Sequence, residues 1–355
     1  MSDRETVSVT PANHINPPDY RFCVAPMMDW TDEHERYFLR LVSARARLYT
    51  EMVTTGALIH GDRTRFLAHS QEEHPVALQI GGSEPEDMAR CASLGEEAGF
   101  DEINMNVGCP SDRVQAGRFG ACLMREPSVV ARCVEAMSQA VSVPVTVKCR
   151  IGVDDDDSFE SLCRFVQTIR DAGCQVVIVH ARKAWLSGLS PKQNREIPPL
   201  HYDRVYALKR SFPEITMVIN GGICSVAEAH QHLAFVDGVM VGREAYQNPW
   251  SLCSVDTELF DQAPRAISRW EVLDEYKHYM APRLEQGVPL KRMVKHLLGL
   301  FQGQPGARSW RRTLSEQAFR FGAGLEAVEA AEQAVKTVHA AHETIDNNAV
   351  EGVAP

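Results

Sequence analysis

Residues 104–111 read NMNVGCPS, a run of strand-forming residues that leads directly into a Gly-Cys-Pro turn. The turn presents the thiol of Cys109, and a second glycine-bearing loop follows at 118–121. In a barrel of parallel strands, catalytic groups are carried at the carboxyl ends of the strands. Cys109 is therefore a candidate catalytic thiol. The alternative is a buried structural cysteine, the common state of a free thiol in a reduced protein.

Seven further strand-like runs accompany this one along the first 245 residues, and most are nearly continuous apolar segments. Such runs are typical of parallel strands with both faces covered. Helix-compatible stretches lie between them, among them 84–98, with Pro85 in its first turn, 128–141 and 157–172. The eight expected strands are 22–27, 48–53, 76–80, 102–107, 145–149, 176–180, 216–220 and 238–241.

Eight strands alternating with helices predict an α/β fold, namely a (β/α)8 TIM barrel. A doubly wound sheet is the rival architecture, and it would carry a G-x-G-x-x-G motif after an early strand. The first expected strand instead ends in APMMD at 25–29. After about residue 255, helical periodicity replaces the strand pattern. We therefore predict a flexible tail over 1–20, a barrel over 21–255, a small all-helical domain over 264–345 and a disordered tail over 346–355.

The composition, with 44% hydrophobic and 24% charged residues among 355, is that of a globular enzyme. No apolar run approaches the roughly 18 residues that a membrane helix requires, and the polar N-terminus does not resemble a signal peptide. Ten cysteines are scattered without C-x-x-C spacing, which argues against a metal cluster or a disulfide framework. The four aspartates at 154–157 are most simply a solvated loop before a helix. We expect no metal and a cytoplasmic location.

Positive charge is concentrated in one part of this acidic chain. The net charge is −10, yet residues 277–320 contain nine Lys/Arg and two Glu, which leaves +7 in this segment and −17 elsewhere. A segment of this kind can bind a polyanion while the whole protein stays acidic. Its apolar residues recur at helical spacing and are expected to form a buried face: Leu290, Met293, Val294, Leu297, Leu298 and Phe301.

The last two expected strands both end in glycine, as MVINGGI at 217–223 and VMVGR at 239–243. Loops after strands seven and eight form the usual phosphate site of TIM barrels. The glycines let backbone N–H groups approach an anion, and Arg243 can add a charged contact. One phosphate site without a dinucleotide fold favours a mononucleotide such as FMN.

Three polar residues end other expected strands and face the same mouth. Lys148 would stabilise the negative charge that a reduced flavin carries at its N1–O2 edge; the alternative is a salt bridge inside the barrel. Gln79 could hydrogen-bond the ring edge. His180 taken alone is an ordinary histidine at a strand end. Because it ends a strand at the same mouth as Lys148 and Gln79, it is a candidate cofactor-binding residue.

The combination of these segments resembles the tRNA-dihydrouridine synthases, and the resemblance covers nearly the whole chain. The long segment 180–195 is similar to that of the bacterial subfamily acting at positions 20 and 20a of the tRNA D-loop, where other subfamilies have a shorter His-Gly-Arg-Thr segment. The matching segments are 25–29 (APMMD), 50–52 (TEM), 79–82 (QIGG), 104–111, 147–152 (VKCRIG), 180–185 (HARKAW) and 220–223 (NGGI).

The resemblance implies an FMN cofactor that NADPH reduces before tRNA enters. Hydride then passes to carbon 6 of the uracil, and Cys109 protonates carbon 5 from the opposite face. A thiol with an ordinary pKa of about 8.5 stays protonated at neutral pH and can serve as this acid. The implied FMN residues are Pro26, Met27, Met28, Gln79, Lys148 and His180, with Asn220, Gly221, Gly222, Gly242 and Arg243 at the phosphate.

The resemblance also implies a tRNA partner, whose target base must be swung out of the folded RNA. Asn106 could anchor the uracil edge, and Lys192, Arg195, Arg308 and Arg311 are the implied tRNA contacts. Arg308, Arg311 and Arg312 also surround Trp310. A solvated cationic face is the alternative for each arginine or lysine taken singly.

Two other functions remain open at this point. Another FMN barrel acting on a free pyrimidine would share the flavin site but would not need the cationic segment. A non-catalytic tRNA-binding protein could retain the flavin without turnover. No protein partner is implied, and we expect a monomer.

Overall fold

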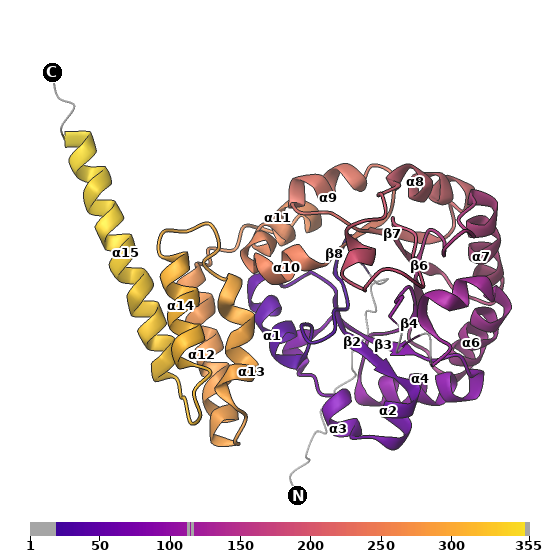
Figure 1. Cartoon of the computed structure of the whole chain (residues 1–355), viewed down its shortest axis with the longest axis horizontal. Helices are drawn as coiled ribbons and strands as arrows, with labels where there is room; N and C mark the ends of the chain where they lie inside the picture. The colour runs from indigo at the N-terminus through magenta and orange to yellow at the C-terminus, as the bar shows by residue number, and fades with distance from the viewer. Residues whose placement is uncertain (1–18, 112–113, 115–116, 352–355) are drawn as a thin grey trace, which may run out of the picture.

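The computed structural model describes residues 19–111, 114 and 117–351. Its eight parallel strands form one sheet in the order β1-β8-β7-β6-β5-β4-β3-β2. A parallel bridge between Cys23 and Arg47 joins the two ends of this order, so the sheet closes into the predicted barrel (Figure 1). The strands are β1 (Phe22–Val24), β2 (Leu48–Thr54), β3 (Val76–Gly81), β4 (Glu102–Val107), β5 (Val145–Arg150), β6 (Val176–His180), β7 (Thr216–Asn220) and β8 (Gly238–Val241).

Helices form the outer layer around the strands (Figure 1). Proline occupies the first turn of α4 and of α6, where its missing N–H has no helical partner to lose. The barrel helices are α1 (Glu33–Val42), α2 (Thr55–His60), α3 (Arg63–Phe66), α4 (Pro85–Ala98), α6 (Pro127–Ala140), α7 (Phe159–Asp171), α8 (Tyr202–Ser211), α9 (Val226–His232), α10 (Arg243–Gln247) and α11 (Val255–Phe260).

The first strand is shorter than the sequence pattern indicated. It was expected over 22–27, but the strand ends at Val24. The carbonyl of Met27 already accepts the N–H groups of Trp30 and Thr31, at 3.1 and 3.0 Å, so the chain turns here. This turn places residues 25–30 at the mouth of the barrel rather than in its wall.

Apolar side chains fill the barrel interior, and Tyr20, Cys23, Tyr49, Ile178 and Met240 belong to this inner cluster. Tyr20 was expected to end a flexible tail, but its side chain is buried. Residues 1–18 of the predicted tail lie outside the described part of the chain.

Glu102 anchors a polar network within this interior. Its carboxylate is fully buried, lies 3.3 Å from the Arg47 guanidinium, and accepts hydrogen bonds from Tyr49 and Thr146 at 2.9 and 2.5 Å. Removing one partner of a buried ion pair leaves the other charge without compensation.

We therefore expect Glu102→Gln to lower the free energy of unfolding by about 3–5 kcal/mol, as measured by urea denaturation. The exposed Glu97, changed to Gln, is the matched control and should stay within about 0.5 kcal/mol of the parent. A loss below about 1 kcal/mol for Glu102→Gln would show that Arg47 finds another partner.

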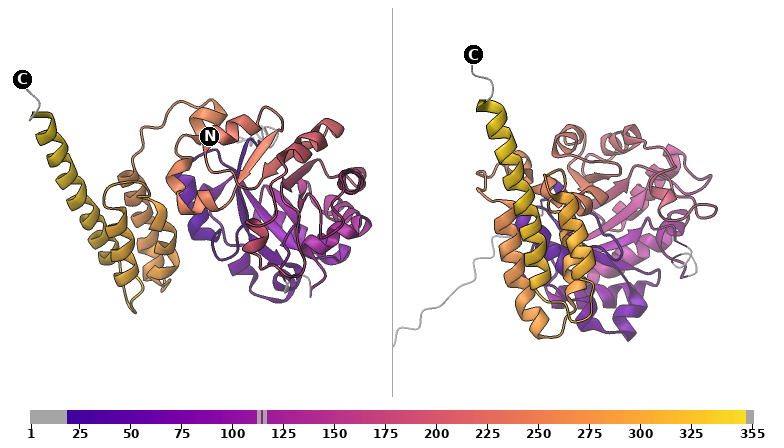
Figure 2. Two further views of the ribbon diagram at one scale, coloured as in Figure 1. Left: turned by 45° about the horizontal axis from the view of Figure 1, so that its top comes forward. Right: turned by 60° about the vertical axis from the view of Figure 1, so that its left-hand side comes forward.

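The C-terminal region is helical, as predicted, and stands beside α1 of the barrel (Figures 1 and 2). The helix expected over 290–301 is divided into α13 and a 3-10 turn, η5. The expected apolar stripe is buried, except that Leu298 is only partly so. The elements are α12 (Arg269–Glu285), α13 (Leu290–Val294), η5 (Lys295–Gly299), α14 (Ala307–Gln317) and α15 (Glu326–Glu351).

One detail of this region differs from the sequence-based expectations. The last helix, α15, continues to Glu351, so the tail predicted to be disordered from 346 begins inside a helix. Trp310 is fully buried and donates its indole N–H to the carbonyl of Leu297 at 2.7 Å. It is therefore part of the domain core and is not available to stack on a base. In the described part of the chain, no helix is both long and apolar enough to cross a membrane.

Candidate active site at the barrel mouth

The carboxyl ends of the strands surround a cavity of about 520 Å³, which we call the mouth cavity. All eleven predicted FMN residues line it, together with Cys109, Asn106 and Arg195. The structure thus collects into one place residues that are spread over more than 200 positions of the sequence. Lys192, Arg308 and Arg311 are not part of the cavity lining.

Asn106 shapes the turn that carries Cys109. Its side-chain oxygen accepts the backbone N–H groups of Gly108 and Cys109, at 3.1 and 3.0 Å. The thiol of Cys109 is half-buried, and its sulfur lies 3.5 Å from the hydroxyl of Ser111. Asn106 therefore positions the thiol, a role that the sequence did not indicate.

The second glycine-bearing loop packs directly against this turn. The N–H of Ala121 donates to the carbonyl of Cys109 at 2.9 Å. Gly120 has a φ of +75°, and a Cβ there would lie 2.6 Å from the same carbonyl oxygen. Only glycine fits this close backbone approach, which explains why the two loops occur together in the sequence.

Gln79 links β3 to β4 at the cavity floor. Its side-chain oxygen accepts from the Asn106 amide at 2.8 Å, and its amide donates to Asn104 at 2.7 Å. The Gln79 amide is thereby held in one orientation at the cavity wall. One amide hydrogen of Asn106 bonds to Gln79, and its side-chain oxygen accepts from the turn. Its second amide hydrogen is therefore available to a ligand.

Lys148 projects from β5 without a carboxylate partner among the described residues. Its ammonium donates to the side-chain oxygen of Asn220 at 3.2 Å. Burial, assisted by the nearby positive charge of Arg150, lowers the pKa of Lys148 to about 8. The alternative of a salt bridge inside the barrel is therefore not realised in the described chain. Because no carboxylate of the described chain pairs with it, the Lys148 ammonium is available to a ligand in the cavity.

His180 and the two glycines after β7 form one tightly packed corner. Gly221 has a φ of +120°, and a Cβ there would lie 2.7 Å from the His180 ring. Gly222 has a φ of +76°, and a Cβ would lie 2.6 Å from Leu200. Burial, followed by repulsion from Arg150 and Lys148, holds the pKa of His180 well below its usual range. The imidazole is therefore neutral and can donate or accept a hydrogen bond.

Arg150 is a cavity residue to which the sequence analysis gave no role. Its guanidinium is nearly fully buried and donates to the carbonyls of Gly108, Lys183 and Asn194, at 2.9, 3.1 and 2.9 Å. It thus joins the cysteine turn to the loop after β6. The only sequence signal was an arginine that ends an apolar strand.

The loop after β6, residues 181–200, is held in shape by side-chain hydrogen bonds within it. Asn194 is buried, accepts the N–H of Trp185 at 2.8 Å, and donates to the carbonyl of the same residue at 2.9 Å. The next residue, Arg195, is exposed and lines the cavity, whereas Lys192 lies exposed outside it.

Arg243, a predicted phosphate contact, forms an ion pair across the mouth. Its guanidinium lies 2.6 Å from the carboxylate of Glu196. The pair ties the loop after β8 to the loop after β6. The sequence gave no indication of this partner, since the two residues lie 47 positions apart.

The predicted tRNA contacts on the helical domain are both exposed on α14. Arg311 donates to the side chain of Gln302 at 2.9 Å, and Arg308 is open to solvent. They form a surface separate from the mouth cavity.

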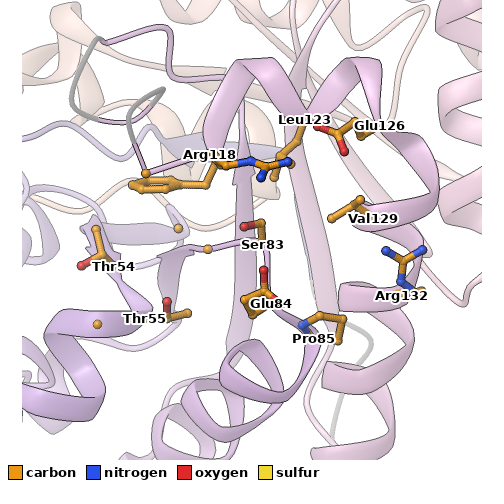
Figure 3. Close-up of a pocket in the computed structure, with 15 residues that line it drawn as sticks. Thr54, Thr55, Ser83, Glu84, Pro85, Arg118, Leu123, Glu126, Val129 and Arg132 are labelled. Carbon is orange, nitrogen blue, oxygen red and sulfur yellow. The ribbon is translucent and has the colours of Figure 1, made fainter.

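A second hollow, of about 640 Å³, opens where α4 and α6 begin (Figure 3). None of the predicted site residues lines it. Its charged groups are mixed, because Arg118 and Arg132 share the rim with Glu84 and Glu126. We assign no ligand to it.

Fold and site together define a (β/α)8-barrel enzyme whose reactive groups meet at the carboxyl ends of the strands. Comparison with solved structures supports the fold alone: 2-naphthoyl-CoA reductase, in its complex with 2-naphthoyl-CoA, matches with a TM-score of 0.52 at 9% identity. That match covers 67% of this chain and 50% of the reductase chain.

Comparison of sequences is more specific. The family model "Dihydrouridine synthase (Dus)" matches residues 23–338. Proteins named tRNA-dihydrouridine(20/20a) synthase are 57% identical over 332 residues in Yersinia pestis and 60% identical over 312 residues in Vibrio cholerae. These alignments cover 93% and 88% of this chain, and 96% and 95% of the relatives. The chain belongs to the dihydrouridine synthase family.

Proposed function

We propose that this protein is an FMN-dependent, NADPH-driven synthase that reduces uridine to 5,6-dihydrouridine at positions 20 and 20a of the tRNA D-loop. The names of its relatives support the reaction and the positions. The observation that carries the proposal is the placement of Cys109, Lys148 and the glycines after β7 and β8 around one cavity. Its ten free cysteines are compatible with a cytoplasmic location.

The mouth cavity has the properties that an FMN site requires. Its volume lies within the range of about 300–1,000 Å³ that small-ligand pockets occupy. Gly221 and Gly222 bring the backbone to the edge of the cavity in conformations that favour glycine. When bound, FMN would supply the hydride to the uracil after reduction by NADPH.

Lys148 and His180 would hold the flavin ring, and the residues after β7 and β8 would hold its phosphate. Lys148 is suited to an electron-rich ring edge because no carboxylate in the described chain neutralises its charge. The neutral imidazole of His180 can donate without adding a second cation. The phosphate residues are Asn220, Gly221, Gly222, Gly242 and Arg243.

Cys109 would supply the proton to carbon 5 of the uracil. The Asn106 side chain fixes the backbone of its turn, so the thiol is presented to the cavity without a conformational search. Arg150, which donates to the carbonyl of the preceding Gly108, helps to hold the same turn. The remaining amide hydrogen of Asn106 could anchor the uracil edge.

The tRNA would lie over the mouth and the helical domain, with the target base swung into the cavity. Arg195 stands at the cavity, Lys192 lies on the loop beside it, and Arg308 and Arg311 are exposed on α14. These residues lie on both domains, as expected of contacts to a substrate much larger than a free pyrimidine.

We expect the double variant Arg308→Ala, Arg311→Ala to bind tRNA about tenfold more weakly, with a salt slope reduced by about 1.5, because two phosphate contacts are lost. Filter binding at several salt concentrations measures both quantities. Reduction of the bound flavin by NADPH should not change. Two exposed arginines of the barrel helices, Arg164 and Arg210, changed together to Ala, provide the matched control.

The proposal as a whole is tested by incubating unmodified tRNA with the protein, FMN and NADPH. Nucleoside mass spectrometry then maps the two-dalton gain of dihydrouridine by position. A gain at positions 20 and 20a supports reaction and positions together, and a gain elsewhere contradicts the positions. If the flavin is reduced and no tRNA position gains mass, the substrate is not this RNA, and a free pyrimidine becomes the next candidate.

A further inference from the structure

The helical domain contacts a loop of the mouth-cavity wall through Lys295. Lys295 begins η5, the 3-10 turn that follows α13. Its ammonium donates to the backbone carbonyl of Asp29 at 2.9 Å and lies 2.9 Å from the carboxylate of Asp32. Asp29 itself lines the mouth cavity, in the loop after β1.

This loop, residues 25–30, needs support from outside itself. All six of its residues line the cavity, among them three predicted FMN contacts, Pro26, Met27 and Met28. Asp29 adopts a φ of +64°, which a residue other than glycine keeps only when its surroundings require it. Its N–H donates to the carboxylate of Glu51 at 2.5 Å, and its carbonyl accepts from Lys295. One of the two backbone anchors of Asp29 is thus supplied by the helical domain.

The position of Lys295 is itself fixed by the contact between the two domains. The next residue, His296, is fully buried, and its two ring nitrogens lie 2.9 Å from Asp32 and 3.0 Å from Glu35, both at the start of α1. Figure 1 shows α13, which leads into this turn, beside α1. These contacts between η5 and α1 therefore fix the position of Lys295 relative to the barrel.

A second contact connects the same turn to the same loop. The hydroxyl of Tyr246 donates to the carbonyl of Lys295 at 3.4 Å. The ring of Tyr246 stacks on Trp30, with the ring centres 4.2 Å apart and the planes at 8°. Trp30 is the last residue of the loop, and Tyr246 belongs to the barrel helix α10, so the barrel side chain that stacks on the loop is itself bonded to the backbone of Lys295.

We infer that Lys295 is a positioning residue for the cofactor wall, through which the helical domain shapes the flavin site as well as contacting tRNA. This inference rests on the proposed FMN function. The division of labour between the two domains is then incomplete: the helical domain serves both ligands.

The test compares Lys295→Met with Lys291→Met in the full-length protein. Lys291 lies one turn earlier, is exposed, and makes no ion pair or side-chain hydrogen bond within the described chain. FMN is titrated into apoprotein and its dissociation constant is read from the quenching of flavin fluorescence. Because a hydrogen bond from a charged group is lost at a partly exposed site, we expect Lys295→Met to weaken FMN binding about tenfold. The visible absorption bands of bound FMN should shift as well, and Lys291→Met should change neither property.

Lys295→Arg provides the rescue, because a guanidinium can reach the same carbonyl, and it should restore the spectrum and most of the affinity. If Lys295→Met does not fold, Lys295→Gln is measured in its place, with weakened FMN binding again expected. Wild-type affinity and an unshifted spectrum in the folded variant would overturn the inference. Failure of the wild-type protein to bind FMN would instead overturn the proposed function, so the two failures are distinguishable.

Discussion

Replacing Cys109 with Ala is expected to reduce dihydrouridine formation by a factor of about 100 to 10,000, the range that a positioned general acid contributes. The alanine keeps the turn, because the turn is held by the backbone N–H of residue 109 and the Asn106 side chain. Only the proposed proton donor is lost. The measurement is single-turnover kinetics with saturating tRNA, which separates the chemical step from binding.

Binding supplies the control for this prediction. The alanine variant should bind FMN and tRNA within about twofold of the parent, since the thiol is half-buried and forms no ion pair in the described chain. Cys122→Ala is the matched variant, because Cys122 is also half-buried, lies in the neighbouring loop and does not line the mouth cavity. Turnover retained at a tenth or more of the parental rate in Cys109→Ala would mean that another group donates the proton, or that the protein acts on RNA without this chemistry.

Replacing Lys148 with Met is expected to have the second largest effect. It removes a cation from the cavity wall, and loss of such a preorganised group typically costs about 100- to 1,000-fold in rate. The step to follow is the reduction of bound flavin by NADPH in a stopped-flow spectrometer. Lys148→Arg keeps the charge and should recover part of the rate, as far as the larger guanidinium fits beside Asn220.

The pH dependence gives an independent check on Lys148. Burial lowers the pKa of this amine to about 8 in the free protein, so the charged form is fully present below that pH and is lost above it. In the proposed function FMN binds the charged form, so its affinity should fall by up to about tenfold between pH 8 and 9. The sign for folding is the opposite: because the unfolded lysine titrates near 10.5, deprotonation between pH 8 and 10.5 relieves a cost of burial and favours the folded apoprotein. An FMN affinity that does not change across this range would contradict the role of Lys148.

The fold was predictable because the relevant signals are local in the sequence. Most of the eight strands are apolar runs of a few residues, and alternation with helices is enough to specify the barrel. The exception is instructive: residues 25–27 are as apolar as a strand, but hydrogen bonds to Met27 turn the chain at that point. Those hydrogen bonds are local, but Asp29, within the turn, is held by contacts with Glu51 and Lys295, which a local pattern could not show.

The membership of the mouth cavity was also predictable, for a topological reason. In a parallel barrel the carboxyl end of every strand faces the same side, so residues such as Gln79, Lys148 and His180 must converge if the strand ends are correctly placed. The structure gathers all of the predicted FMN residues there. Their proposed chemical roles remain predictions that the experiments above address.

The sequence by itself determined the barrel, the helical segment with its buried stripe, and the convergence of strand-end residues such as Gln79, Lys148 and His180 at the mouth. Each of these follows from periodicity and from the order of elements along the chain. Only the tertiary structure decided the partners: Arg150 on three carbonyls, Glu196 on Arg243, and Lys295 on the carbonyl of Asp29. These contacts join side chains to groups between 33 and 266 residues away. Hydrogen bonds over such separations depend on where folding brings the backbone. Because every residue has a backbone carbonyl, the sequence cannot indicate which carbonyl will accept a given hydrogen bond.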